Sequence, residues 1–148
     1  MATRDIVLWT DDFLRKKSRP VEKFDEKLHE LLDDMKETLV LEKGAGLSAV
    51  QIGSLKRCFV ISINGVYMEF VNPVIEKTSG KQINKEGCLS VKLSSEYVQR
   101  PAKVTLSAFD RYGNPFTFTC TEWTAIAVMH ENDHLDGILY IDKIVKDC

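Results

Sequence analysis

The first regular pattern of apolar positions lies between Pro20 and Leu39. Its apolar residues step by three and four along the chain: Phe24, Leu28, Leu31, Met35 and Leu39. This spacing places them on one face of a helix, and proline is tolerated at a helix start. We therefore predict a helix that begins near Pro20, reaches Leu39 and turns its charged side chains to solvent.

Two later segments carry the alternating pattern of antiparallel hairpins. The runs RCFVISI and VYMEFV flank Asn64 and Gly65, and Asn-Gly between two β-rich runs is the strongest short signal for a hairpin. The runs KVTLSAFD and PFTFTC flank RYGN, and Val104, Leu106 and Ala108 alternate with polar residues. We expect one hairpin at each of these places.

The segment after Thr121 is apolar on nearly every side until His130. Thr121 is a suitable N-cap and Gly137 a suitable C-terminal stop, so we predict a buried helix that ends near Leu135. The run ILYID then predicts a short closing strand. A helix, several antiparallel strands and a buried helix, in this order, predict an α+β fold. The absence of a repeat or linker predicts a single domain over residues 1–148.

Composition and charge remove several classes of protein. The chain has 148 residues and a formal net charge of −2, which gives no basic surface for nucleic acid or anionic lipid. No apolar run approaches the length of a membrane span. The cysteines, Cys58, Cys88, Cys120 and Cys148, form no CxxC pair. We expect reduced thiols, a cytoplasmic location, and neither nucleic-acid nor membrane partners.

The sequence HENDH at residues 130–134 carries the main chemical signal. Residues four apart on a helix point the same way, so His130 and His134 can both bind one tetrahedral ion. Glu131 lies about 100° round the helix, where it can reach a water on the metal without binding the metal. The alternative is a pair of histidines that bond only to backbone or solvent.

The third metal ligand stays open on this reasoning alone. His29 falls on the charged face of the first predicted helix, so we expect it at the surface. The remaining candidates are Cys88, Glu86 and the other acidic residues. Cys88 stands beside Gly87, where the backbone can turn tightly, although a lone cysteine is more often a small core residue.

Three segments together resemble one family. GAGLSAVQ at 44–51, EGCLS at 86–90 and HENDHLDG at 130–137 are similar to the peptide deformylase motifs GxGLAAxQ, EGCLS and HExDHLxG, in the same order. Only 14 residues follow His134, so the chain resembles the short form of the family, which has no C-terminal extension. We expect such a form in a compact bacterial lineage or in a phage protein that acts in its host's cytosol.

The resemblance implies a role for each matching residue. It implies metal ligands at Cys88, His130 and His134, a catalytic acid/base at Glu131, oxyanion donors at the Gln51 amide and the Leu89 backbone N–H, and a backbone contact to substrate at Gly46. The implied reaction removes the formyl group from N-formylmethionine on new polypeptides, through attack by a metal-bound water, and releases formate. The implied cofactor is one divalent ion per chain, usually Fe²⁺, with Zn²⁺, Ni²⁺ or Co²⁺ as other occupants.

Substrate selectivity follows from the residues around these motifs. A tight loop from Gly44 to Leu47, through Ala45 and Gly46, leaves room for the hydrogen of a formyl group but not for an acetyl methyl, and Gly87 is also expected to contact substrate. Trp123 and Ala127 lie seven and three residues before His130, so we predict that they line an apolar pocket for the methionine side chain. Ile126 is assigned to core packing.

Several positions depart from the family pattern, and two other functions stay open. Ser48 stands where alanine is frequent, Met129 where glutamine is frequent, Lys92 in place of proline, and Ser95 in place of arginine, whereas Arg100 is retained. The alternatives are an HExxH zinc endopeptidase and an inactive deformylase fold that only binds. We expect a monomer that meets formylmethionyl nascent peptides, with at most transient proximity to the ribosome.

Overall fold

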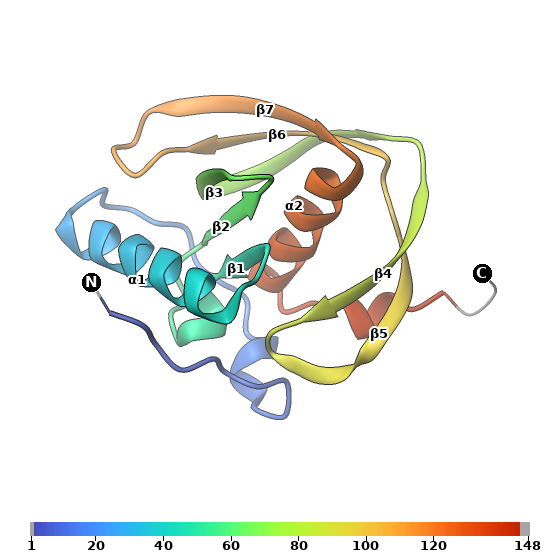
Figure 1. Ribbon diagram of the computed structural model, residues 1–148. Helices are drawn as coiled ribbons and strands as arrows, with labels where there is room; N and C mark the ends of the chain where they lie inside the picture. Colours follow the sequence, from blue (N-terminus) through green and yellow to red (C-terminus); the bar gives the residue numbers. More distant parts are fainter. Residues whose placement is uncertain (1, 146–148) are drawn as a thin grey trace.

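A long helix lies between two antiparallel sheets in the computed structural model, which describes residues 2–145 (Figure 1). The helix is α2 (Glu122–Leu135). One sheet has five strands in the spatial order β1-β2-β3-β6-β7, and the other pairs β4 with β5. The predicted α+β class is therefore confirmed. Cys148 and the last residues of the predicted domain lie outside the described residues.

The five-stranded sheet is antiparallel throughout. Its strands are β1 (Gly46–Ser48), β2 (Cys58–Ile63), β3 (Val66–Ser79), β6 (Lys103–Phe109) and β7 (Pro115–Thr121). Both predicted hairpins are confirmed. The first turns at Asn64 and Gly65, whose φ angles of 53° and 78° give the tight turn that Asn-Gly favours. The second, between β6 and β7, turns where the Asp110 carboxylate accepts from the Tyr112 and Asn114 backbone N–H groups.

The two-stranded sheet was not predicted from the sequence. It pairs β4 (Gln82–Cys88) with β5 (Val91–Arg100). Most residues of both strands are exposed or half-buried, so the pattern of apolar residues that marks a half-buried strand is weak here. The pairing register shifts between Glu86 and Cys88, so the strand is irregular where the second motif lies.

Helix α1 (Glu26–Glu42) begins later than predicted. The expected start near Pro20 is wrong because Asp25 forms the cap: its carboxylate accepts from the Leu28 backbone N–H at 3.1 Å. The predicted apolar face is otherwise confirmed, since Leu28, Leu31, Met35 and Leu39 are all buried.

The end of α2 agrees with the prediction, whereas the segment after it does not. The helix follows Thr121 and stops before Gly137, which has a φ of +76°. The predicted strand ILYID is instead a 3-10 turn, η3 (Tyr140–Lys143). The Asp142 carboxylate accepts from the Leu139 backbone N–H at 3.0 Å, and this local bond favours a turn over an extended strand.

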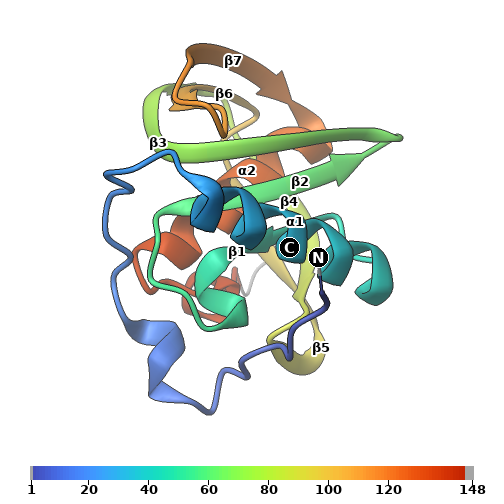
Figure 2. The same cartoon turned by 90° about the vertical axis from the view of Figure 1, so that its left-hand side faces the viewer.

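The two helices cover opposite faces of β2, as the turned view shows (Figure 2). Cys58 and Val60 of this strand pack in the cluster that contains the buried face of α1. Phe59 and Ile61, which alternate with them, pack in the cluster that contains Val128 of α2. A third cluster forms around short turns η1 (Asp12–Arg15) and η2 (Ala49–Ile52). Among the described residues, no helix has the length and apolarity to span a membrane.

Candidate active site

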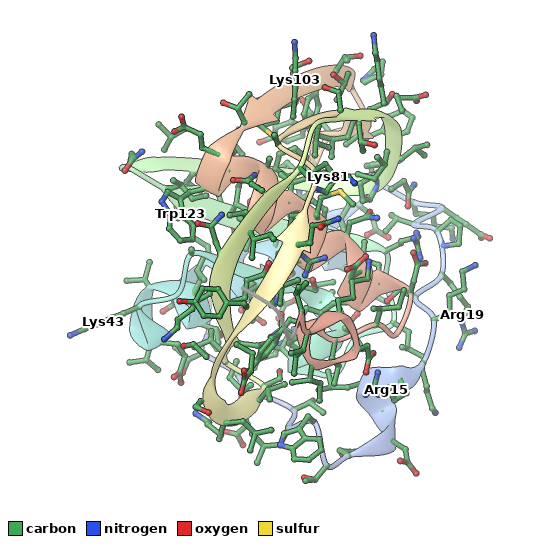
Figure 3. The ribbon with its side chains drawn as sticks, turned by 90° about the vertical axis from the view of Figure 1, so that its right-hand side faces the viewer. Arg15, Arg19, Lys43, Lys81, Lys103 and Trp123 are labelled. Carbon is green, nitrogen blue, oxygen red and sulfur yellow. The ribbon has the colours of Figure 1, made fainter. Side chains whose placement is uncertain are left out.

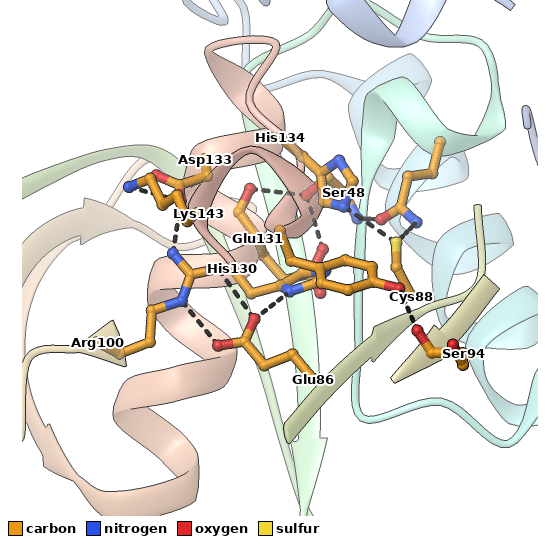
Figure 4. A network of polar contacts seen from close by, with 12 residues as sticks. Ser48, Glu86, Cys88, Ser94, Arg100, His130, Glu131, Asp133, His134 and Lys143 are labelled. Carbon is orange, nitrogen blue, oxygen red and sulfur yellow. Dashed lines mark hydrogen bonds and ion pairs between the residues drawn. The ribbon is translucent and has the colours of Figure 1, made fainter. Parts of the chain in front are cut away.

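The chain brings Cys88, His130 and His134 together where β4 ends beside α2 (Figure 4). One donor atom from each of the three lies within 4.8 Å of the others, and the Cys88 Sγ is 3.3 Å from the His134 Nε2. Such a set of one thiolate and two imidazoles suits a tetrahedral ion with one position left for water. Glu86, the other open candidate, is not part of this group and instead contacts His130.

The electrostatics of this group favour a cation. Burial disfavours an imidazolium, yet the Cys88 sulfur and Glu86 raise the pKa of His130 to about 10. Burial and the charge of His130 lower the pKa of His134. A bound ion would replace the proton that this environment attracts to His130. Because the His130 Nδ1 donates to the Glu86 Oε1 at 2.8 Å, its Nε2 is left for the metal.

A buried ionic network holds Glu86 in place. The Arg100 guanidinium donates to both Glu86 oxygens at 2.8 and 2.9 Å and to the Asp133 Oδ2 at 2.6 Å. Lys143 completes the network at 3.1 Å from Asp133. Although burial penalises the carboxylate, Arg100 and His130 hold the pKa of Glu86 below its ordinary value. Arg100 was retained in the sequence without an assigned partner; its two partners, Glu86 and Asp133, are acids inside the second and third motifs.

Glu131 has a different environment, on the β1 side of α2. Its carboxylate accepts from the Ser48 hydroxyl at 2.9 Å, and the same hydroxyl lies 2.8 Å from the Glu131 backbone carbonyl. Its other carboxylate oxygen packs against Gly46, where an added Cβ would approach to 2.7 Å. Burial raises the pKa of Glu131, and His130 and Ser48 oppose this only in part. Such a carboxylate can take up a proton, as a general base must.

Gln51 points its amide nitrogen at the cysteine. Its Oε1 accepts from the Ser48 backbone N–H at 2.9 Å, which leaves the Nε2 to donate to the Ser90 hydroxyl at 3.0 Å and to approach the Cys88 Sγ to 3.6 Å. The side chain is buried. The amide orientation is therefore determined, and the N–H that only approaches the Cys88 sulfur is the one available to an oxyanion near this group.

A cavity of about 660 Å³ opens in front of these groups. Gln51, Cys88, His130 and Glu131 all line it. It is also lined by nearly all of the residues predicted to contact substrate: Ala45, Gly46, Gly87, Leu89, Trp123 and Ala127. Trp123 lines the cavity and is 59% exposed, and Figure 3 shows it near the edge of the molecule.

Two residues lie differently from the prediction. Leu47 does not line the cavity, because its side chain is wholly buried in the cluster under α1; the alternation of β1 turns it away from its neighbour Gly46. Ile126, which the sequence analysis assigned to core packing, is buried but also lines the cavity. His134 does not line the cavity, although its Nε2 lies 3.3 Å from the Cys88 Sγ, which does.

The departures from the family pattern divide into two kinds. Lys92 and Ser95 are exposed on β5, and Met129 packs with the apolar cluster behind α2. Only Ser48 contacts a predicted catalytic side chain.

Comparisons with known proteins agree with this geometry. The family model described as polypeptide deformylase matches residues 3–148. A curated peptide deformylase of Caldicellulosiruptor bescii is 50% identical over 146 residues, which cover 99% of this chain and 88% of that relative. The crystal structure of a Thermotoga maritima peptide deformylase has a TM-score of 0.96 and 31% identity, with 99% of this chain and 100% of that chain covered.

One solved relative holds a peptide. It is a class I type b peptide deformylase of Acinetobacter baumannii bound to Met-Ala-Ser, with a TM-score of 0.91 and 26% identity over 96% of this chain and 98% of that chain. These matches do not favour an endopeptidase or an inactive binding module. The fold, the arrangement of the three motifs and the match over nearly the whole length all lead to one assignment: the chain belongs to the polypeptide deformylase family.

Proposed function

We propose that the protein removes the formyl group from N-formylmethionine at the start of new polypeptides and releases formate. The observation that carries this proposal is the placement of Glu131 and Gln51 around the Cys88, His130 and His134 group, with all but His134 lining one cavity. The Acinetobacter baumannii relative is bound to Met-Ala-Ser, a peptide with the methionine that a deformylated product would carry.

Each predicted catalytic residue has a step that its contacts permit. Cys88, His130 and His134 would hold a divalent ion, which when bound would supply a Lewis acid and lower the pKa of a water molecule toward neutrality. Glu131 accepts a proton from the attacking water and returns it to the leaving amine. The Gln51 NH₂ group and the Leu89 backbone N–H donate to the oxygen that becomes negative, and loss of one such donor typically costs about 10²–10³ in rate.

Selectivity for a formyl group comes from the narrow side of the cavity. Gly44, Ala45 and Gly46 line it opposite Gly87 and Cys88. Even a Cβ on Gly46 would collide with Glu131, so little free space lies between this segment and the catalytic carboxylate. A formyl hydrogen fits where an acetyl methyl would not.

The methionine side chain enters the apolar part of the cavity. Ile126, Ala127 and Trp123 of α2 line this region. Ile126 is buried and Trp123 is largely exposed, so we place the floor of the pocket at Ile126 and Ala127 and its rim at Trp123. An unbranched thioether adapts to such a pocket.

We further infer that the native ion is Fe²⁺ and that the protein acts as a monomeric, single-domain enzyme in a cytoplasm, near the ribosome only while nascent chains emerge. Iron is oxidisable and stands beside an oxidisable thiolate, whereas Zn²⁺ has no redox chemistry. Initial rates of the two metal forms, before and after an hour in air, test the ion. We expect fast, air-sensitive turnover with Fe²⁺ and slower, air-stable turnover with Zn²⁺. Equal rates and equal survival would contradict this.

The decisive experiment measures formate released from formyl-Met-Ala by protein purified without oxygen. Acetyl-Met-Ala is the matched control, because it adds one methyl group at the reacting carbon. We expect formate from the first peptide and no acetate from the second. Cleavage of an internal peptide bond in a longer substrate, with no formate, would favour the endopeptidase, and the absence of any turnover in a metal-loaded protein would favour a binding module.

A further inference from the structure

Ser48 stands at a position where the family frequently has alanine, and it is the one departure that reaches a predicted catalytic side chain. It is the last residue of β1 and is fully buried. Its hydroxyl lies 2.8 Å from the carbonyl oxygen of Glu131 and 2.9 Å from the Glu131 Oε1. One side chain therefore joins β1 to α2 through two residues that are 83 apart in the sequence.

The Glu131 carboxylate has few other restraints. Among residues 2–145, the Ser48 hydroxyl is the only hydrogen-bond donor to this carboxylate, and its single proton is shared with the Glu131 carbonyl oxygen. The Gly46 backbone limits the Oε2 from the other side, but a glycine offers no side chain to bond it. A glutamate side chain has several rotatable bonds, so packing on one side and a hydrogen bond on the other together select a single orientation.

Ser48 also reaches the second predicted catalytic group through its backbone. Its N–H donates to the Gln51 Oε1 at 2.9 Å, which turns the amide NH₂ toward Cys88. An alanine at position 48 would keep this backbone bond and lose only the hydroxyl. A Ser48→Ala variant therefore separates the contact to Glu131 from the contact to Gln51.

We propose that Ser48 is a positioning residue, whose hydroxyl holds the Glu131 carboxylate in the one orientation that faces the reacting water. The inference rests on the acid/base role proposed for Glu131. Placement of a reacting group governs rate more than substrate affinity, because the substrate touches the cavity lining and not the buried hydroxyl. Removal of the hydroxyl should therefore lower kcat and leave KM unchanged.

The first test compares Ser48→Ala and Ser48→Thr with the unchanged protein, each loaded with Zn²⁺. We expect Ser48→Ala to lower kcat on formyl-Met-Ala about tenfold, with KM and metal content within twofold of the original. Ser48→Thr retains the hydroxyl and should recover most of the loss. Ser18→Ala is the matched control, because Ser18 is equally buried and its hydroxyl has no partner among the described residues. It should leave kcat within twofold.

A double-mutant cycle distinguishes positioning from a general loss of structure. In a Glu131→Gln background no base remains to be positioned, so adding Ser48→Ala should lower the residual rate by less than twofold. A general structural defect would lower it by the same tenfold in both backgrounds. This comparison decides the matter even if the threonine variant does not fit the buried site.

A crystal structure of the Zn²⁺-loaded Ser48→Ala protein gives a readout that does not depend on activity. We expect the Glu131 carboxylate to occupy a second orientation. If Ser48→Ala keeps kcat within twofold and the carboxylate is unmoved, while Glu131→Gln is inactive, the inference about Ser48 is wrong and the proposed function stands. If Glu131→Gln keeps more than about a tenth of kcat, the proposed base is wrong and Ser48 has nothing to position.

Discussion

Glu86 and Glu131 make an instructive pair. Each is 5% exposed, and each lies beside His130, one through a hydrogen bond and the other through the chain. Glu86 has a buried guanidinium and an imidazole as partners, and its pKa is lowered. Glu131 has one hydroxyl, and burial raises its pKa. Two carboxylates with the same exposed fraction thus have pKa values shifted in opposite directions: charged partners lower the one, and burial raises the other.

The difference separates a permanent anion from a group that can exchange a proton. A carboxylate held by Arg100 loses both hydrogen bonds and charge pairing if it is protonated, so it stays ionised and orients His130. A carboxylate bonded by a hydroxyl can gain or lose a proton at smaller cost, because a hydroxyl both donates and accepts. In this pair, the presence or absence of a buried cation as partner decides whether burial raises the pKa of the carboxylate.

The variant Glu131→Gln tests directly whether Glu131, unlike Glu86, exchanges a proton during turnover. An amide cannot accept the proton of the attacking water, so we expect kcat to fall by about 10²–10⁴, with metal still bound because Glu131 is not a ligand. Stopped-time formate assays and metal analysis of the same sample check both parts. A variant that retains more than about a tenth of kcat would remove Glu131 from the role of base.

Arg100→Met tests the other carboxylate through its partner. It leaves Glu86 and Asp133 buried without their main cation, so we expect the free energy of unfolding to fall by about 3–5 kcal/mol, measured by urea denaturation. Lys143→Met is the control, because its side chain is 39% exposed and pairs with the same Asp133; it should cost at most about 1 kcal/mol. Similar losses in both variants would mean that burial of the cation does not matter.

Glu86→Gln keeps the shape of the side chain and removes its charge. The His130 ring loses a charged acceptor that fixes its orientation, so we expect metal affinity to fall by about 10–100-fold, measured by competition with a chelator. Glu96→Gln is the matched control, since Glu96 is the register partner of Glu86 on β5 and contacts no ligand. An unchanged affinity in the first variant would show that Glu86 supports the fold and not the site.

Gly46→Ala tests the packing that Glu131 has and Glu86 lacks. The new Cβ would lie 2.7 Å from the Glu131 Oε2, so the carboxylate or the strand must shift, at a cost of about 1–3 kcal/mol in stability. We expect kcat to fall as well. The shorter side chain in Glu131→Asp should relieve the collision, so Gly46→Ala should cost less stability in that background. Equal costs in both backgrounds would place the strain elsewhere.

The first hairpin turn and the end of α2, which each depend on one or two residues, could be predicted from the sequence. Asn64 and Gly65 determine their turn through the φ angles that they alone adopt readily, and Gly137 ends α2 for the same reason. The β4 and β5 strands escaped prediction because their side chains are mostly exposed or half-buried, and the start of α1 was misplaced because the cap at Asp25 outweighs the proline signal.

The candidate site divides in the same way. The predicted ligands and base lie in short motifs. Residue type and spacing were enough to predict His130, His134 and Glu131, whereas Cys88 followed only from the resemblance of EGCLS to the family motif. The contact from Ser48 to Glu131 joins segments 83 residues apart, and the contact from Arg100 to Glu86 joins two strands, β4 and β5, that were not predicted. No periodicity reports such a pairing, and Leu47 was misjudged because loop proximity does not say which way a side chain turns.

The bond from Ser48 to Glu131 closes a loop of 83 residues, and the contact of Cys88 with His134 closes one of 46. Closing loops of this length lowers the conformational entropy of the chain, and only the interactions of the complete fold offset that loss. A partly folded chain therefore has neither an oriented base nor an assembled set of ligands, so the site appears only with the cooperative native state. By mass action, an ion that binds only this state also stabilises it, and the melting temperature of the protein becomes a measure of metal supply.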